Sequence, residues 1–375
     1  MIPFDTLEPD PWHFARPKLA DAYLDAFDLK LSSARGMFAR RRMGKTEFLR
    51  MDLLPNAAAR GYLVAYTNLW DNRAAPETAL LAALMDALEP QGVNAVIAKL
   101  RLPVKKIKAS AKIVGGAEGS LEAELGQSSA ASAANALHHV LRALDKQKKT
   151  LLLVIDEAQI LAHAMHSDFA HALRAALDIR KDKVKVVFAG SSETTLRAMF
   201  ARSSEPFYNW AALEPFPLLD EEFVKFTIEK MNSIAKNTLT LSQGRTAFEE
   251  LHRTPEFFKR FVEQFLINPF DGEAAALERT KATVFSDENF KKQWDELSKS
   301  DQAVVAMLAA GESDFHAAAV LAHLTDALGK PVTKNTMAHA LRRLQASNIV
   351  TKLAYGEYHI EDEAYAEWVR RRRRN

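Results

Sequence analysis

The segment from Ala39 to Thr46 combines residue types that bind phosphate. It reads Ala-Arg-Arg-Arg-Met-Gly-Lys-Thr, and it lies between an apolar run and a helical pattern. In this context backbone N–H groups and a helix N-terminus surround a phosphate. Lys45 is expected to reach the β- and γ-phosphates, and the Thr46 hydroxyl to bind Mg²⁺. The predicted phosphate-binding residues are Ala39, which replaces the usual first glycine, Arg40, Arg41, Arg42, Met43, Gly44, Lys45, Thr46 and Glu47.

An acidic pair follows the most apolar run of the chain. Leu151–Ile155 is the pattern of a strand buried on both faces, and it ends in Asp156 and Glu157. We expect Asp156 to hold the water shell of Mg²⁺ and Glu157 to orient or deprotonate an attacking water. The two segments together predict a site that binds and hydrolyses ATP, with ATP and Mg²⁺ as its cofactors.

A third polar group follows the apolar run Val184–Ala189. Gly190 is followed there by Ser191 and Ser192. A side chain at the tip of a neighbouring strand can contact the γ-phosphate or the attacking water, so both serines are candidate catalytic residues. An ordinary helix N-cap is an equally good interpretation of the same residues.

Alternating apolar strands and longer helical stretches surround these groups, which predicts a parallel α/β sheet. Ligands of such sheets bind at the carboxyl ends of the strands, where all three polar groups lie. The predicted strands are residues 36–38, 62–68, 151–155, 184–189 and 213–217.

Length and composition limit the remaining possibilities. The chain has 375 residues, enough for two or three domains, with 48% hydrophobic and 26% charged residues. A net charge of +2 does not by itself indicate a nucleic-acid-binding protein. No apolar run is long enough to span a membrane, and the N-terminus lacks a basic-then-apolar signal, so we expect a cytoplasmic protein without a membrane partner. The absence of cysteine excludes disulfides and thiolate ligands.

The rest of the chain divides into three further predicted parts. Lys105, Lys106, Lys108 and Lys112 lie in a predicted inserted hairpin, about residues 103–126. Four helical patterns then predict a helical lid, and the last unit has the helix-helix-helix-hairpin order of a winged helix. The expected domains are a P-loop ATPase core (1–217), a helical lid (218–287) and a winged helix with a basic tail (288–375).

The third helix of the last unit, capped by Thr333 or Asn335, predicts a DNA-reading surface. Met337, Leu341 and Leu344 give it one buried face. Its opposite side offers polar and basic residues that in a helix-turn-helix read bases and contact phosphates: Lys334, Asn335, Thr336, His339, Arg342 and Arg343. Alternatively, a winged helix can serve as a protein-docking module.

The chain ends in a run of five arginines, Arg370, Arg371, Arg372, Arg373 and Arg374. Five like charges repel one another, so we expect a tail that is disordered when unbound. If the tail binds double-stranded DNA, it would displace counterions from the phosphate backbone and would not distinguish one base sequence from another. A solvated, frayed tail without function is the alternative.

Several segments together resemble the archaeal-type ATPases of the AAA+/STAND group of P-loop proteins, which are similar to origin-recognition initiators. The resemblance lies in Phe14–Arg16, Arg41–Thr46, Tyr66–Trp70, Ile155–Gln159 and Phe188–Ser192. It implies an AAA+-type P-loop sheet with a helical lid, followed by a winged helix.

The resemblance also implies roles for particular residues. Phe14 and Arg16 would lie near the adenine. A neighbouring subunit of an ATP-dependent homo-oligomer would supply an arginine to the γ-phosphate. Arg202 is the candidate, with Arg197 in reserve, and Lys259 or Arg260 of the lid would contact the phosphates within the same chain.

Two function hypotheses from different classes follow. The first is an ATP-dependent molecular switch that binds double-stranded DNA, favoured by the basic helix face and the arginine run. The second is a STAND-type signalling or scaffolding ATPase whose winged helix binds a further protein partner. A small-molecule kinase is disfavoured because the lid and the last unit offer no obvious acceptor pocket.

Overall fold

The computed structural model describes residues 10–72, 75–88, 130–235, 237–285, 288–311, 318–329, 331–347, 349–354 and 357–374. The predicted hairpin at about 103–126 lies outside these residues. The chain forms two compact units. The first comprises Met1–Ala39, Lys45–Ser191 and Thr195–Phe216, and the second comprises Arg40–Gly44, Ser192–Thr194 and Pro217–Asn375.

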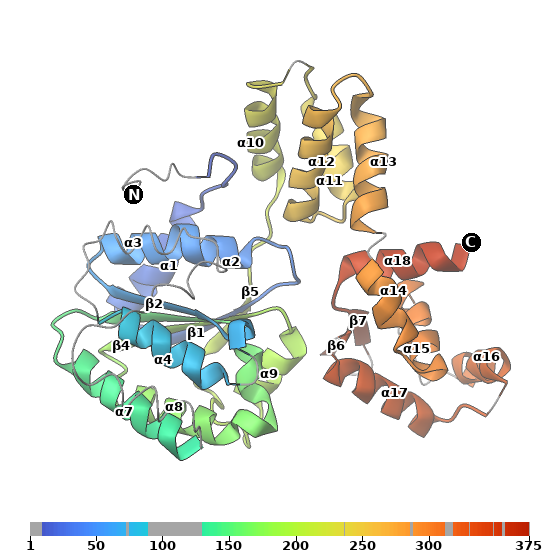
Figure 1. Cartoon of the computed structure of the whole chain (residues 1–375). Coiled ribbons are helices and arrows are strands. Elements are labelled where there is room, and N and C mark those ends of the chain that lie inside the picture. Colours follow the sequence, from blue (N-terminus) through green and yellow to red (C-terminus); the bar gives the residue numbers. More distant parts are fainter. Residues whose placement is uncertain are drawn as a thin grey trace. The chain divides into compact units, whose positions relative to one another are not determined.

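A parallel five-stranded sheet forms the centre of the first unit (Figure 1). Its strands are β1 (Ala34–Phe38), β2 (Leu63–Asn68), β3 (Leu151–Asp156), β4 (Val184–Gly190) and β5 (Ala212–Pro215). Their order in the sheet is β2-β3-β4-β1-β5. The register places Asn68 beside Asp156 and Phe38 beside Gly190, so the carboxyl ends of four strands meet at one edge. The predicted parallel α/β sheet is confirmed.

Helices cover both faces of this sheet, as Figure 1 shows. On one face lie α1 (Pro17–Asp28), α2 (Lys45–Phe48), the π-helical turn η2 (Leu49–Leu53) and α3 (Leu54–Ala59). On the other lie α4 (Pro76–Asp86), α7 (Ala130–Asp145), α8 (Ser167–Asp178) and α9 (Glu193–Ala201). Three short 3₁₀ turns, η3 (Leu69–Asn72), η5 (Ala158–Ala162) and η6 (Ala164–His166), complete the set.

The central strands are apolar because helices shield both faces of them. Every residue of β3 and β4 is buried. Side chains of alternate strand residues therefore enter the two helix–sheet cores, which explains the continuous apolar runs in the sequence. On one side Leu153 and Phe188 pack with apolar residues of α4, α7 and α8.

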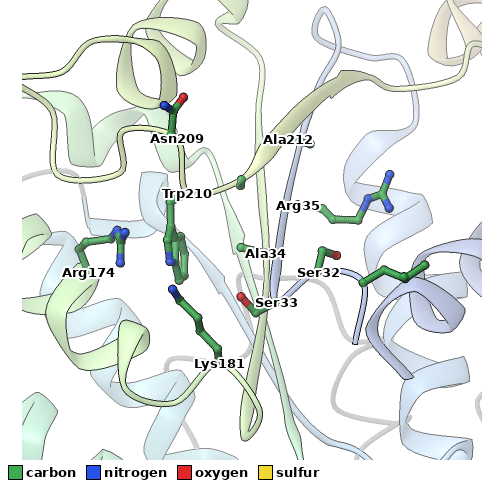
Figure 2. A pocket seen from close by; sticks show the side chains of 11 residues that line it. Ser32, Ser33, Ala34, Arg35, Arg174, Lys181, Asn209, Trp210 and Ala212 are labelled. Carbon is green, nitrogen blue, oxygen red and sulfur yellow. The ribbon is translucent and has the colours of Figure 1, made fainter. Parts of the chain in front are cut away.

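A pocket of about 540 Å³ lies at the amino-terminal ends of β1 and β5 (Figure 2). It is built from the turn before β1, from α8 and the loop after it, and from the loop that enters β5. Because β1 runs from this pocket to the predicted phosphate-binding loop, the two features lie at opposite ends of the same strand.

The second unit begins with four helices, α10 (Glu221–Asn232), α11 (Leu241–Glu250), α12 (Pro255–Ile267) and α13 (Gly272–Val284). The Asp220 side chain caps α10, and Thr240 forms a capping box with Gln243 at α11. Rings of Phe223, Phe248 and Phe258 lie 5.3–5.9 Å apart and form the core between α10, α11 and α12.

The last part of the chain has the element order expected of a winged helix. It contains α14 (Glu288–Asp295), α15 (Lys299–Ala309), α16 (Ala318–Leu328), α17 (Lys334–Ala346), the antiparallel strands β6 (Val350–Ala354) and β7 (Glu357–Ile360), and α18 (Glu363–Arg374). Thr333, and not Asn335, caps α17, in a capping box with Thr336. Across the described ranges, no helix is long and apolar enough to cross a membrane.

The predicted disorder of the arginine run is wrong. The backbone continues as α18 through Arg374. Glu367 pairs with Arg370 at 2.9 Å and with Arg371 at 3.2 Å, and the Arg372 guanidinium lies 5.4 Å from the centre of the Trp368 ring. Carboxylate pairing and cation–π contact offset the repulsion between neighbouring arginines, which the sequence rule for like charges does not include.

Candidate functional site

The loop between β1 and α2 has the backbone of a phosphate-binding turn. Arg42 has a φ of 66° and Gly44 a φ of 80°, both in the left-handed region. Glycine adopts this conformation without strain, whereas a side chain at position 44 would be strained even though its Cβ would meet no atom within 4 Å. The turn directs the chain into α2, so Lys45 and Thr46 begin the helix directly after the loop.

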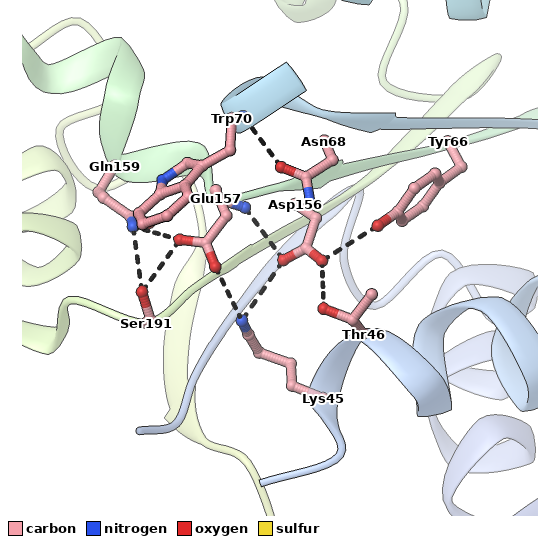
Figure 3. A network of polar contacts seen from close by, with 9 residues as sticks. All are labelled: Lys45, Thr46, Tyr66, Asn68, Trp70, Asp156, Glu157, Gln159 and Ser191. Carbon is pink, nitrogen blue, oxygen red and sulfur yellow. Dashed lines mark hydrogen bonds and ion pairs between the residues drawn. The ribbon is translucent and has the colours of Figure 1, made fainter. Parts of the chain in front are cut away.

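Lys45 and Thr46 meet the acidic end of β3 (Figure 3). The buried Lys45 Nζ lies 3.4 Å from Asp156 Oδ1 and 3.9 Å from Glu157 Oε1. Thr46 Oγ1 donates a hydrogen bond of 2.6 Å to Asp156 Oδ2. Residues 110 positions apart in the sequence therefore form one polar cluster at the carboxyl edge of the sheet.

Asp156 is fully buried, and four donors satisfy its carboxylate. Besides Lys45 and Thr46, the Tyr66 hydroxyl donates to Oδ2 at 3.2 Å and the Glu157 N–H donates to Oδ1 at 3.0 Å. Burial, followed by the charge of Asp156, raises the pKa of Tyr66 well above 10, so the tyrosine remains a neutral donor. These donors satisfy the oxygens of a carboxylate in an interior where an unpaired polar group is costly.

Glu157 is held apart from Asp156 by its backbone. Its φ of 55° and ψ of 39° are left-handed, which is uncommon for a residue with a side chain. The carboxylate accepts a hydrogen bond of 2.5 Å from Gln159 Nε2 and one of 3.0 Å from Ser191 Oγ. Figure 3 shows Ser191 and Gln159 converging on Glu157, while Thr46 and Tyr66 converge on Asp156. The two neighbouring carboxylates therefore share Lys45 and otherwise have different side-chain partners.

Gly190 is required by the close approach of Gln159. A Cβ at position 190 would lie 2.1 Å from Gln159 Oε1 and 2.7 Å from Leu196 Cδ1. Real Cβ atoms do not approach other atoms so closely, so any larger residue displaces the glutamine amide that contacts Glu157.

The residues of this cluster fit a magnesium-bound nucleotide. The Thr46 hydroxyl and the Asp156 carboxylate are oxygen donors of the kind that Mg²⁺ prefers, and their bond of 2.6 Å places both within reach of one ion. Lys45 supplies a cation beside them, and the space around Gly44 leaves room for a phosphate to approach the backbone.

A segment before α1 packs on the helix that follows the phosphate-binding loop. His13 Nδ1 lies 3.0 Å from Glu47 Oε1, and His13 Nε2 lies 2.9 Å from Asp52 Oδ1. Burial opposes the imidazolium charge, but the hydrogen bonds and charges of Asp52 and Glu47 outweigh it and raise the pKa of His13 to about 9. Arg16 lies 4.2 Å from the centre of the Phe216 ring and 5.2 Å from that of Phe48.

Arginines predicted for the phosphates lie in different surroundings. In the second unit, Arg42 donates to Asp362 Oδ2 at 2.7 Å and lies 5.3 Å from the centre of the Phe257 ring. Arg197 in α9 lies 5.0 Å from the centre of the Phe38 ring. Arg202, the predicted arginine for a neighbouring subunit, is exposed directly after α9.

The predicted DNA-binding residues of α17 are mostly exposed. Lys334, Asn335, His339 and Arg342 are exposed, while Met337, Leu341 and Leu344 are buried. Arg343 differs, because its guanidinium lies 2.7 Å from Asp301 Oδ1 of α15. Of the arginine run, Arg370 Nε also donates to the Ala309 carbonyl at 2.7 Å. Arg343 and Arg370, which were both predicted to contact DNA phosphates, therefore already have partners within the second unit.

Comparison with solved structures identifies the class of the fold. The chain resembles a Walker-type ATPase of Pyrococcus abyssi, with a TM-score of 0.64 and 16% identity over 98% of this chain and 99% of that one. It also resembles the ORC2 protein of Aeropyrum pernix in its ADPNP–ADP complexes, with a TM-score of 0.57 and 14% identity over 96% of this chain and 93% of that one. The fold is therefore that of the archaeal ORC-like AAA+ ATPases. No protein-family model matches this chain, and no curated protein matches it.

Sequence reasoning did not assign roles to Tyr66 and Gln159, which build the cluster, or to His13, which packs on the helix after the phosphate-binding loop. Tyr66 and Gln159 lay inside segments that carried the family resemblance, and His13 immediately precedes one of them. Tyr66 ends up beside Asp156 because β2 pairs with β3. A polar side chain near the end of a strand beside the acidic strand was the signal that could have identified it.

Proposed function

We propose that the protein is an ATP-dependent molecular switch that binds and hydrolyses ATP and engages double-stranded DNA. The observation that carries the nucleotide part is the cluster of Lys45, Thr46, Asp156 and Glu157, with Ser191 bonded to Glu157. A cation, a hydroxyl and two carboxylates are the groups that phosphoryl transfer to water requires.

Each residue has a distinct role in this proposal. Lys45 binds the β- and γ-phosphates, and Thr46 and Asp156 hold Mg²⁺, which neutralises charge on the phosphates when bound. Glu157, oriented by Ser191 and Gln159, accepts a proton from a water that attacks the γ-phosphorus, and the bond from that phosphorus to the β–γ bridging oxygen breaks. Phe14 and Arg16 contribute to the adenine side.

The switch works through assembly. ATP joins copies of the chain in a homo-oligomer, and Arg202 of one copy reaches the γ-phosphate of the next. Its exposure after α9 supports this role, because an arginine that acts on a neighbouring subunit has to be accessible. Hydrolysis then resets the assembled state.

The DNA part rests on the exposed side of α17. Lys334 and Arg342 supply positive charge there, and Asn335 and His339 supply groups that can read base edges. The helix has a buried apolar face opposite, so these residues are presented on a rigid element.

A second candidate is a STAND-type scaffold whose last unit binds a protein. The internal partners of Arg343, Arg370 and Arg371 favour it, because they reduce the charge available to DNA phosphates. Light scattering after size exclusion, with and without ATP and with and without duplex DNA, separates the two. A salt-sensitive complex with DNA supports the first candidate. ATP-dependent assembly without any DNA complex at low salt supports the second.

Two variants test the nucleotide site. Lys45→Ala removes the cation for the phosphates, so nucleotide affinity should fall at least about 100-fold, roughly 2.7 kcal/mol. Glu157→Gln should retain ATP but slow hydrolysis by about 10²–10⁴-fold, because the amide cannot accept a proton. Unchanged nucleotide affinity in Lys45→Ala, measured by calorimetry, would refute the site.

A further inference from the structure

The pocket at the amino-terminal ends of β1 and β5 has no part in the nucleotide chemistry. Lys45 begins beyond the carboxyl end of β1, and the five residues of that strand span about 16 Å. The volume of about 540 Å³ lies within the range of about 300–1,000 Å³ typical of small-molecule sites. The pocket lies entirely within the first unit.

Cations from three separate segments line this pocket. Arg174 comes from α8 and Lys181 from the loop after α8, and both lie beside Trp210, whereas the Arg35 side chain of β1 points away from them, with its guanidinium 5.1 Å from the centre of the Tyr23 ring of α1 (Figure 2). Hydroxyl, amide and indole groups complete the polar lining, from Ser32, Ser33, Asn209 and Trp210. Aspartate and glutamate are absent from the described residues that line it.

The carboxylates that pair with the lining cations do not neutralise all of the positive charge of the pocket. Asp178 pairs with Arg174 and lies 3.1 Å from Lys181, and Glu214 pairs with Arg35. On the side of the pocket that holds Trp210, Arg174 and Lys181 against Asp178 leave one net positive charge. Lys146, Lys148 and Lys149 are exposed in the loop before β3, and the exposed carboxylates of Asp145 and Asp182 lie at the same edge of the sheet.

Three buried donors at the pocket have no hydrogen-bond partner among the described residues. They are Ser32 Oγ, Arg35 Nε and Arg174 Nε. A buried donor without a partner costs roughly 1–3 kcal/mol. These three atoms are buried behind the surface of the pocket, so the groups that face a ligand are the exposed parts of the lining side chains. Burial lowers the pKa of Arg174, which agrees with a guanidinium held away from bulk water against the Trp210 ring, 5.0 Å from the ring centre.

We propose that this pocket is a second ligand site, which binds a phosphate monoester. A phosphate offers three acceptor oxygens to donors that approach from several sides, and guanidinium and ammonium groups are its usual partners. The volume exceeds what a bare phosphate fills, so the ester carries an organic body of sugar or nucleotide size, with Trp210 as a flat wall. The ligand is either a free sugar phosphate or the phosphorylated end of a nucleic-acid strand.

Calorimetry with the full chain tests the proposal, with Mg²⁺–ADP saturating the phosphate-binding loop. The probes are ribose 5-phosphate, neutral ribose, and a short single strand with and without a 5′-phosphate. We expect ribose 5-phosphate to bind and ribose not to bind. Lys181→Glu should weaken the binding at least about tenfold. Stronger binding of the strand that carries a 5′-phosphate, lost in the same variant, would identify the source as a nucleic-acid end.

Lys148→Glu is the matched control. It makes the same charge change at an exposed residue of the same sheet edge but does not line the pocket. Its affinity for ribose 5-phosphate should stay within about twofold of the wild type. Equal binding of ribose 5-phosphate to the wild type and to Lys181→Glu, or no binding to either, overturns the proposal. Repeating the titration in Lys45→Ala keeps the result independent of the nucleotide site.

Discussion

Ser191 Oγ donates a hydrogen bond of 3.0 Å to Glu157 Oε2, and this bond links the end of β4 to the residue after β3. It fixes one carboxylate oxygen on the side away from Lys45, whose Nζ lies 3.9 Å from the other oxygen. The helix N-cap interpretation of Ser191 does not account for this contact.

Ser191→Ala should lower ATP hydrolysis about tenfold with little change in ATP affinity, because Glu157 loses a charge-assisted hydrogen bond worth roughly 1.5 kcal/mol. Steady-state hydrolysis together with nucleotide binding measures both quantities. Ser192→Ala is the matched control and should lower the rate of ATP hydrolysis less than Ser191→Ala does, since the hydrogen bond to Glu157 comes from Ser191. A larger loss in Ser192→Ala would reverse the assignment of the two serines.

Gly190→Ala should reduce ATP hydrolysis at least as much as Ser191→Ala does, because the added Cβ would lie 2.1 Å from Gln159 Oε1. The displaced amide can no longer hold Glu157. In a Gln159→Ala background the same glycine substitution should have little further effect, since the clash is gone and Leu196 can shift its terminal methyl. Additive losses in this double-mutant cycle would show that Gly190 acts by another route.

The His13 contact predicts a pH-dependent stability. Its pKa rises from the ordinary 6.5 to about 9, so the stabilisation is complete below pH 6.5 and is lost as pH rises through 9. At 1.36 kcal/mol per pH unit, this amounts to about 2–3 kcal/mol between pH 6 and pH 9. Thermal unfolding of His13→Gln should lack this decline, whereas His139→Gln, at an exposed histidine of α7, should retain it. Parallel pH profiles for wild type and His13→Gln would contradict the prediction.

Two adjacent arginines of α17 should respond differently to substitution. Arg342→Gln should flatten the slope of log DNA affinity against log salt by about 0.9, the value for one lost phosphate contact. Arg343→Gln should mainly destabilise the last unit, because Asp301, a buried residue, loses its partner at 2.7 Å. Fluorescence anisotropy over a salt series and thermal unfolding measure the two effects. Equal slopes for wild type and Arg342→Gln would exclude this residue from the interface.

The sequence alone determined the parts of the molecule that follow local rules. Each of the five predicted strands is present, because an apolar run that ends in polar or turn residues favours a strand without reference to distant residues. The glycine at position 44 and the Lys45–Thr46 pair follow the same logic, since a left-handed turn before a helix has a fixed sequence pattern.

Only the tertiary structure decided which distant side chains meet. His13 finds Glu47 and Asp52, and Gln159 packs against Gly190, because strand order and helix packing bring separate segments together. The arginine run shows the same limit, because its charge pattern indicates disorder, whereas Glu367 and Trp368 of the same helix stabilise it. Electrostatic and packing energies depend on distance in space, and the sequence records only distance along the chain.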